Sequence, residues 1–100
     1  MTDDGIRAEI AAETAGLSGT VFLLEHPKYC PSGRAWLRSL AEFGVYCAEC
    51  FGEAAPSLTR VDADLSALAE LERLLPPGAS VTGEWVGEEE ETVLVEITLQ

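Results

Sequence analysis

The chain has 100 residues, of which 47% are apolar and 24% are charged, a composition that fits one folded domain. No stretch approaches the ~18 consecutive apolar residues that a membrane-spanning helix needs. Membrane insertion is therefore not expected. Eighteen acidic residues against six Lys and Arg give a net charge of -12. Because this charge repels polyanions, nucleic-acid binding is not expected either.

The N-terminal segment, residues 1–19, begins with acidic residues and lacks a basic stretch followed by an apolar run. It therefore does not resemble a secretory signal, and three cysteines cannot all pair within one chain. Both features favour a cytoplasmic protein. Ile6, Ile10 and Leu17 fit a narrow helical stripe, whereas Ile6, Ala8 and Ile10 also alternate as in a strand. The alanine content favours a helix.

Residues 20–25 form a continuous apolar run, which predicts a strand buried on both faces. Residues 26–33 contain two prolines and a glycine and predict a loop, with Ser32 placed to cap a helix. The helix is expected to end at Gly44. At 100° per residue its apolar side comprises Trp36, Leu37, Leu40, Phe43 and Gly44.

The next predicted elements are a strand over 45–51, a turn over 52–56 and a half-exposed strand over 57–61. A second helix follows, capped by Asp62 or Asp64, and residues 76–78 (Pro-Pro-Gly) end it. Its apolar face comprises Leu65, Leu68, Leu71, Leu74 and Leu75.

Alternating apolar residues over 81–85 and 93–99, separated by a turn over 87–91, predict a hairpin. The order from residue 20 is β-α-β-β-α-β-β, which predicts an α+β fold of the ferredoxin-like split βαβ type with an extra C-terminal strand. We expect one domain over 1–100, with the ferredoxin-like core over 20–86 and the added hairpin strand over 87–100. Both of its helices should cover one sheet face, which leaves the other face for residues 4–17, a partner subunit or a ligand.

Residues 31–45 (Pro-Ser-Gly-Arg-Ala-Trp-Leu-Arg-Ser-Leu-Ala-Glu-Phe-Gly-Val) resemble the first loop, helix and second-strand entry of ACT-type regulatory domains. The resemblance implies a non-enzymatic domain that senses a small ligand, commonly an amino acid, at a homodimer interface near this loop. The expected ligand-binding residues are His26, Lys28, Ser32, Gly33 and Arg34.

The same loop supports two other interpretations. Residues 30–33 (Cys-Pro-Ser-Gly) resemble a monothiol thioredoxin-like site, in which a helix N-terminus stabilises a thiolate. Alternatively, if the predicted first and second strands run parallel, four side chains meet near one sheet edge and supply a tetrahedral zinc site. These side chains are His26, Cys30, Cys47 and Cys50.

An acidic run supports a further alternative, an inhibitor or immunity-type module that binds a basic partner protein. Its contact residues would be Glu84, Glu88, Glu89, Glu90 and Glu91. The chain has one histidine and lacks a Ser-His-Asp arrangement, an HExxH motif and a phosphate-binding loop. Enzymatic activity is therefore not expected.

Overall fold

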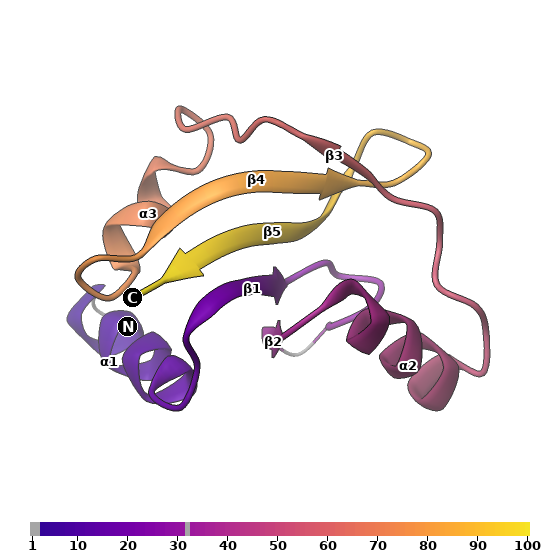
Figure 1. Ribbon diagram of the computed structural model, residues 1–100, viewed down its shortest axis with the longest axis horizontal. Helices are drawn as coiled ribbons and strands as arrows, with labels where there is room; N and C mark the ends of the chain where they lie inside the picture. The colour runs from indigo at the N-terminus through magenta and orange to yellow at the C-terminus, as the bar shows by residue number, and fades with distance from the viewer. Residues whose placement is uncertain (1–2, 32) are drawn as a thin grey trace.

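The computed structural model describes residues 3–31 and 33–100 as an α+β domain with one five-stranded antiparallel sheet (Figure 1). In chain order the elements are α1 (Asp3–Thr14), β1 (Gly19–Leu24), β2 (Ala35–Leu37), α2 (Leu40–Phe51), β3 (Thr59–Val61), α3 (Ala69–Leu74), β4 (Ser80–Val86) and β5 (Thr92–Leu99).

The strands lie in the order β2-β1-β5-β4-β3, so β5 is central and the two three-residue strands form the edges. Every neighbouring pair is antiparallel. Strand β1 pairs Val21 with Ile97 of β5 and Phe22 with Leu37 of β2. Because neighbouring residues of a strand point to opposite faces, these pairings determine which side chains share a face.

Both faces of the sheet carry an apolar cluster. One face packs against α1 and α3, which lie side by side at one end of the sheet in Figure 1. The other face packs against α2, mainly through Phe43 and Cys47. The strand residues of the first cluster are Val21, Leu23, Val81, Val95, Ile97 and Leu99, and those of the second are Phe22, Leu24, Leu37, Val93 and Leu94.

Several predicted elements are confirmed. The N-terminal segment contains a helix, and residues 21–24 of the predicted buried strand are all buried. The predicted strand over 57–61 is observed as β3, and the two C-terminal strands form the expected antiparallel hairpin.

The prediction for residues 34–51 was wrong. Residues 35–37 form a strand that pairs with β1, and the helix begins after Ser39 and continues to Phe51. Residues 45–51 are therefore helical, and the chain order from residue 19 is β-β-α-β-α-β-β. Gly44 lies inside the helix, whereas Gly52, with φ of 66°, ends it in the left-handed conformation that favours glycine.

Two further expectations need correction. The second predicted helix is observed as α3, which is short and is not capped by Asp62 or Asp64. The carboxylate of Asp64 instead stabilises the turn before α3, where it accepts hydrogen bonds from the amides of Ser66 and Ala67. The two helices that follow β1 do not share a face of the sheet, because α3 packs with α1 whereas α2 packs on the opposite side. Since β1 buries successive residues on both faces, each face requires its own apolar cover.

No helix within 3–31 and 33–100 is long and apolar enough to cross a bilayer.

Candidate functional site

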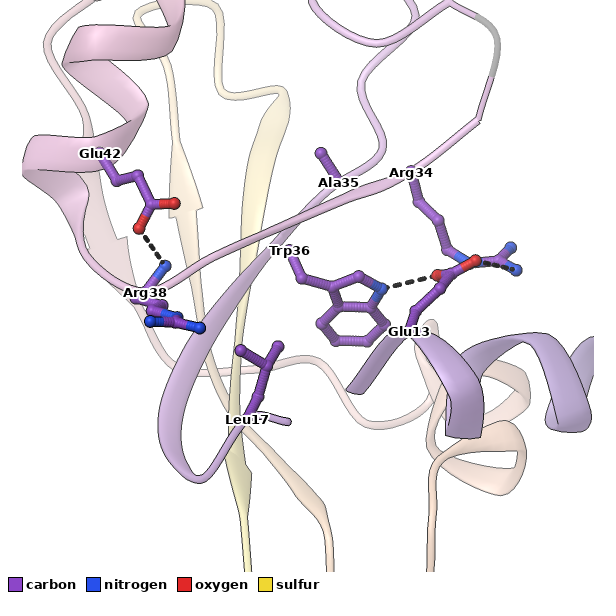
Figure 2. A pocket seen from close by; sticks show the side chains of 7 residues that line it. All are labelled: Glu13, Leu17, Arg34, Ala35, Trp36, Arg38 and Glu42. Atoms are coloured by element: carbon purple, nitrogen blue, oxygen red, sulfur yellow. Dashed lines mark hydrogen bonds and ion pairs between the residues drawn. The ribbon is translucent and has the colours of Figure 1, made fainter. Parts of the chain in front are cut away.

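The edge strand β2 and the residue before it bring the side chains of Trp36 and Arg34 next to the last turn of α1. Trp36 pairs with Leu23 in the sheet, and its ring packs on the face that α1 covers. Arg34, immediately before β2, extends toward the same helix (Figure 2). The hairpin between β1 and β2 therefore joins residues that are more than twenty positions apart in the sequence.

Glu13 of α1 is the centre of this network. Its Oε1 atom accepts a hydrogen bond of 2.7 Å from the Trp36 indole Nε1 and one of 2.9 Å from Arg34 Nε. The Nη2 atom of Arg34 also lies 3.0 Å from Oε2 of Glu9, one helical turn earlier. Because one arginine holds two carboxylates, both partners of Arg34 are fixed on the same face of α1.

The electrostatics of the pair follow from these bonds. Partial burial acts to raise the pKa of Glu13, but hydrogen bonds from Trp36 and Arg34 outweigh it and hold that pKa below its ordinary value. Burial acts to lower the pKa of Arg34, but the hydrogen bonds that it donates to Glu13 and Glu9 outweigh burial and raise that pKa. The ion pair therefore stays charged at neutral pH.

A depression of about 560 Å³ lies beside this network, between α1, β2 and the start of α2. Figure 2 shows its lining residues: Glu13, Leu17, Arg34, Ala35, Trp36, Arg38 and Glu42. Its walls combine an indole ring and an aliphatic side chain with charges of both signs. This is the composition of a site that orients a small polar molecule by a few convergent groups.

Arg38 differs from the other arginine of the depression because its guanidinium is uncompensated. Within residues 3–31 and 33–100, no carboxylate forms an ion pair with it. The same side chain lines a second depression of about 210 Å³ next to Leu17 and Thr20. In a chain with eighteen carboxylates, an arginine with free donors on the wall of two depressions is a candidate anion contact.

The start of α2 holds the backbone of Arg38 in place. The hydroxyl of Ser39 accepts a hydrogen bond of 3.1 Å from the Glu42 amide, and Oε2 of Glu42 accepts one of 2.9 Å from the Arg38 amide. This arrangement is a variant of the capping box, in which the Glu42 carboxylate binds the amide one residue before the N-cap. It leaves the Arg38 guanidinium available while fixing the chain that carries it.

The predicted ligand-binding residues separate in the structure. Arg34 lines the depression, and with Gly33 it lines a neighbouring hollow against Glu9 and Glu13. His26 and Lys28 lie elsewhere in the loop, where both contact the ring of Tyr29. Ser32 falls outside the described residues.

The residues predicted to bind zinc do not share a strand edge. Cys47 is buried in α2, Cys50 is exposed on the same helix, and Cys30 is half-buried in the loop. The His26 ring packs on Tyr29, and its Nδ1 accepts a hydrogen bond from the Lys28 amide. In the described part of the chain, no three His, Cys, Asp or Glu side chains converge in an arrangement suited to a metal ion.

The acidic residues predicted to bind a partner also differ from one another. Both carboxylate oxygens of Glu84 are occupied, by the Asp64 amide at 3.1 Å and by the Thr92 hydroxyl at 2.9 Å. The carboxylate of Glu91 folds over Gly87. The exposed members of the run are Glu88, Glu89 and Glu90.

Of the seven residues that line the depression, the predicted ligand-binding set contained Arg34 alone. Arg38 could have been found from the pattern at residues 39–42, Ser-Leu-Ala-Glu, which predicts a helix start at Ser39 and places Arg38 immediately before it. No local pattern connects Glu13 with Trp36, because their contact depends on how α1 packs against β2.

No protein-family model matches the chain, and the searches of curated proteins and of solved structures likewise give no significant match.

Proposed function

We propose that this chain is a small, non-enzymatic regulatory or binding domain, and that the depression between α1, β2 and α2 takes a small acidic ligand. The observation that carries the proposal is the Arg38 guanidinium, which lines the depression and forms no ion pair with a described carboxylate. A ligand carboxylate or phosphate would supply the missing acceptors, in a bidentate arrangement that suits arginine.

The remaining lining groups narrow the ligand class. The indole ring of Trp36 offers an apolar surface, and the carboxylates of Glu42 and Glu13 also line the depression. A molecule with one acidic group, one amino or hydroxyl donor and a small apolar part would match the Arg38 guanidinium, the carboxylates and the Trp36 ring respectively. Amino acids and related metabolites have this chemistry, which agrees with the ligand class that the ACT resemblance implies.

The direct test is a thermal-shift screen of amino acids, hydroxy acids and small phosphates against the natural chain and Arg38→Gln. A ligand of this class should raise the melting temperature of the natural chain and leave the variant unchanged. Lys28→Gln serves as the control, because it also removes a positive charge but lies in the loop, outside the depression. The proposal is wrong if no compound raises the melting temperature, or if Arg38→Gln responds as strongly.

The family relationships remain proposals. The α+β class and the antiparallel sheet support a ferredoxin-like relationship only at the level of fold class, because the element order differs and the helices cover both faces. Residues 31–45, which carry the ACT resemblance, span β2 and the first half of α2.

Homodimerisation is a related proposal, supported by exposed apolar side chains on α2. Val45 is 54% exposed and Phe51 is 41% exposed, so two apolar side chains of this helix are accessible to a partner. Sedimentation of the natural chain and of Val45→Glu tests it. A concentration-dependent dimer that the variant abolishes supports dimerisation, and a monomer at all concentrations contradicts it.

A second candidate function is binding of a basic partner protein by the turn between β4 and β5. The exposed carboxylates of Glu88, Glu89 and Glu90 support it, together with the net charge of -12. A triple Gln substitution should abolish capture of such a partner, and should leave the ligand response of the Arg38 depression intact. Unchanged capture would contradict this candidate.

Zinc binding by His26, Cys30, Cys47 and Cys50 stays a prediction from the sequence, because no three such side chains of the described residues converge in an arrangement suited to a metal ion. Native mass spectrometry with and without a chelator tests it. A mass difference of one zinc ion supports the site, and identical masses contradict it.

A further inference from the structure

A second groove lies along the middle of α1, between this helix and the turn that joins α3 to β4. It has a volume of about 370 Å³, which falls in the usual range for small-molecule sites. Its walls include Ala11 of α1, Leu75 at the end of α3, and the turn residues Pro76 and Pro77. Figure 1 shows α1 and α3 converging at this end of the molecule.

The walls of the groove are almost free of hydrogen-bonding groups. Pro76 and Pro77 have no backbone N–H, and the side chains of Ala11 and Leu75 are aliphatic. The groove therefore offers little to a polar ligand body, while an aliphatic chain would remove apolar surface from water at both partners.

Two arginines also line the groove. Arg73 is already held by Asp3 at 2.7 Å and by Glu70 at 3.3 Å. No carboxylate in the described ranges pairs with the guanidinium of Arg7. One uncompensated positive charge thus borders an apolar surface.

The apolar surface extends beyond the first groove. A second hollow of about 220 Å³ shares Ala11, Pro76 and Pro77 with it and continues to Leu17 and Leu99. The two hollows together form a track that leads from the Arg7 guanidinium along α1. A ligand that follows this track must be elongated and apolar, with its charge at one end only.

We propose that this groove binds a medium-chain carboxylate, with the carboxylate on Arg7 and the aliphatic chain against Ala11 and the two prolines. The site is separate from the depression at Arg38, because the two have no lining residue in common except Leu17 at the far end of the track. It does not depend on the function proposed above.

The test is a calorimetric titration of the full chain with octanoate, and with octan-1-ol as the uncharged analogue of equal chain length. We expect one saturable octanoate site and at least about tenfold weaker binding of the alcohol, because a charge-assisted hydrogen bond is lost. Arg7→Gln should weaken octanoate by a similar factor. Ala11→Leu, which fills the groove from an exposed helix position, should abolish binding, whereas Ala8→Leu on the same helix and Arg38→Gln should leave it unchanged.

Three results would overturn the proposal. The first is absence of saturable octanoate binding. The second is equal affinity for octanoate and the alcohol, which would remove the role of Arg7. The third is octanoate binding that Ala11→Leu leaves intact.

Discussion

The Trp36 indole Nε1 lies 2.7 Å from Oε1 of Glu13, and this hydrogen bond joins the edge strand β2 to the last turn of α1 (Figure 2). Arg34 bonds to the same carboxylate oxygen. One glutamate therefore receives two donors from the β1–β2 hairpin, and the wall of the depression depends on it.

Removal of this carboxylate should destabilise the fold and loosen the depression. Glu13→Ala breaks the hydrogen bond from Trp36 and the two from Arg34, and we expect the free energy of unfolding to fall by about 1–2 kcal/mol. Urea denaturation, monitored by far-UV circular dichroism, measures this free energy. Glu9→Ala, which removes a single exposed contact with Arg34, should cost about 0.5 kcal/mol or less. Equal effects of the two substitutions would contradict the central position of Glu13.

The stability of the fold should depend on pH in part through Glu96. A hydrogen bond from Arg60 is the main cause that lowers the pKa of Glu96 below its ordinary value; partial burial opposes it, and bonds from Thr82 and Trp85 assist it. A carboxyl group with a lowered pKa in the folded state stabilises the fold above its unfolded pKa, and this contribution is lost as the pH falls through the folded pKa.

The corresponding experiment compares the unfolding free energy of Glu96→Gln with that of the natural chain. At neutral pH the variant should be less stable by about 1 kcal/mol, and the difference should shrink in acid, as the pH falls through the lowered pKa of Glu96 in the folded state. Glu89→Gln in the exposed turn is the control. A constant difference at both pH values would show that Glu96 acts through packing and not through its charge.

The start of α2 should depend on one hydroxyl group. Ser39→Ala removes the hydrogen bond to the Glu42 amide, and we expect a loss of about 1 kcal/mol in the free energy of unfolding. Ser57→Ala, at an exposed position outside the helices and strands, should change it by less than about 0.5 kcal/mol. If both variants were as stable as the natural chain, the capping box would contribute nothing.

The three thiols should react with an alkylating agent in a fixed order. Cys50 is exposed and should react first, half-buried Cys30 second, and buried Cys47 last. Burial also raises the pKa of the Cys47 thiol, with smaller contributions from Glu53 and Cys50, which lowers its thiolate fraction further. Peptide mass spectrometry after timed exposure to iodoacetamide measures the order. Early modification of Cys47 in the folded protein would contradict the packing of α2.

The strands with strong local patterns were predictable from the sequence. The uninterrupted apolar run of β1 indicates burial on both faces, and the alternation in β4 and β5 indicates an antiparallel pair; both are observed. In each case the pattern is long enough to distinguish a strand from a helix.

Residues 34–51 could not be assigned in the same way, because their apolar residues satisfy both periods. Trp36 and Leu37 fit a helix stripe, but they are buried on opposite faces of the sheet through pairing with β1. That pairing is a tertiary contact with no local pattern. The capping box at Ser39 was the one local signal that would have moved the helix start.

The candidate site was only partly predictable for the same reason. Arg34 was expected at a ligand site because of the resemblance of residues 31–45 to ACT-type domains, and it lines the depression. Glu13 and Trp36 come together through the packing of α1 on β2, which no spacing in the sequence encodes.

The two tryptophans allow a direct test of the Arg38 depression. Trp36 lines it, whereas the Trp85 indole bonds to Glu96 on the opposite face of the sheet. In a ¹⁵N-labelled sample, a small acidic ligand from the thermal-shift screen should shift the Trp36 indole N–H signal and the Arg38 amide signal, and leave the Trp85 indole signal in place. A ligand that shifts Trp85 and leaves Trp36 unchanged, or that shifts neither, would contradict binding at this site.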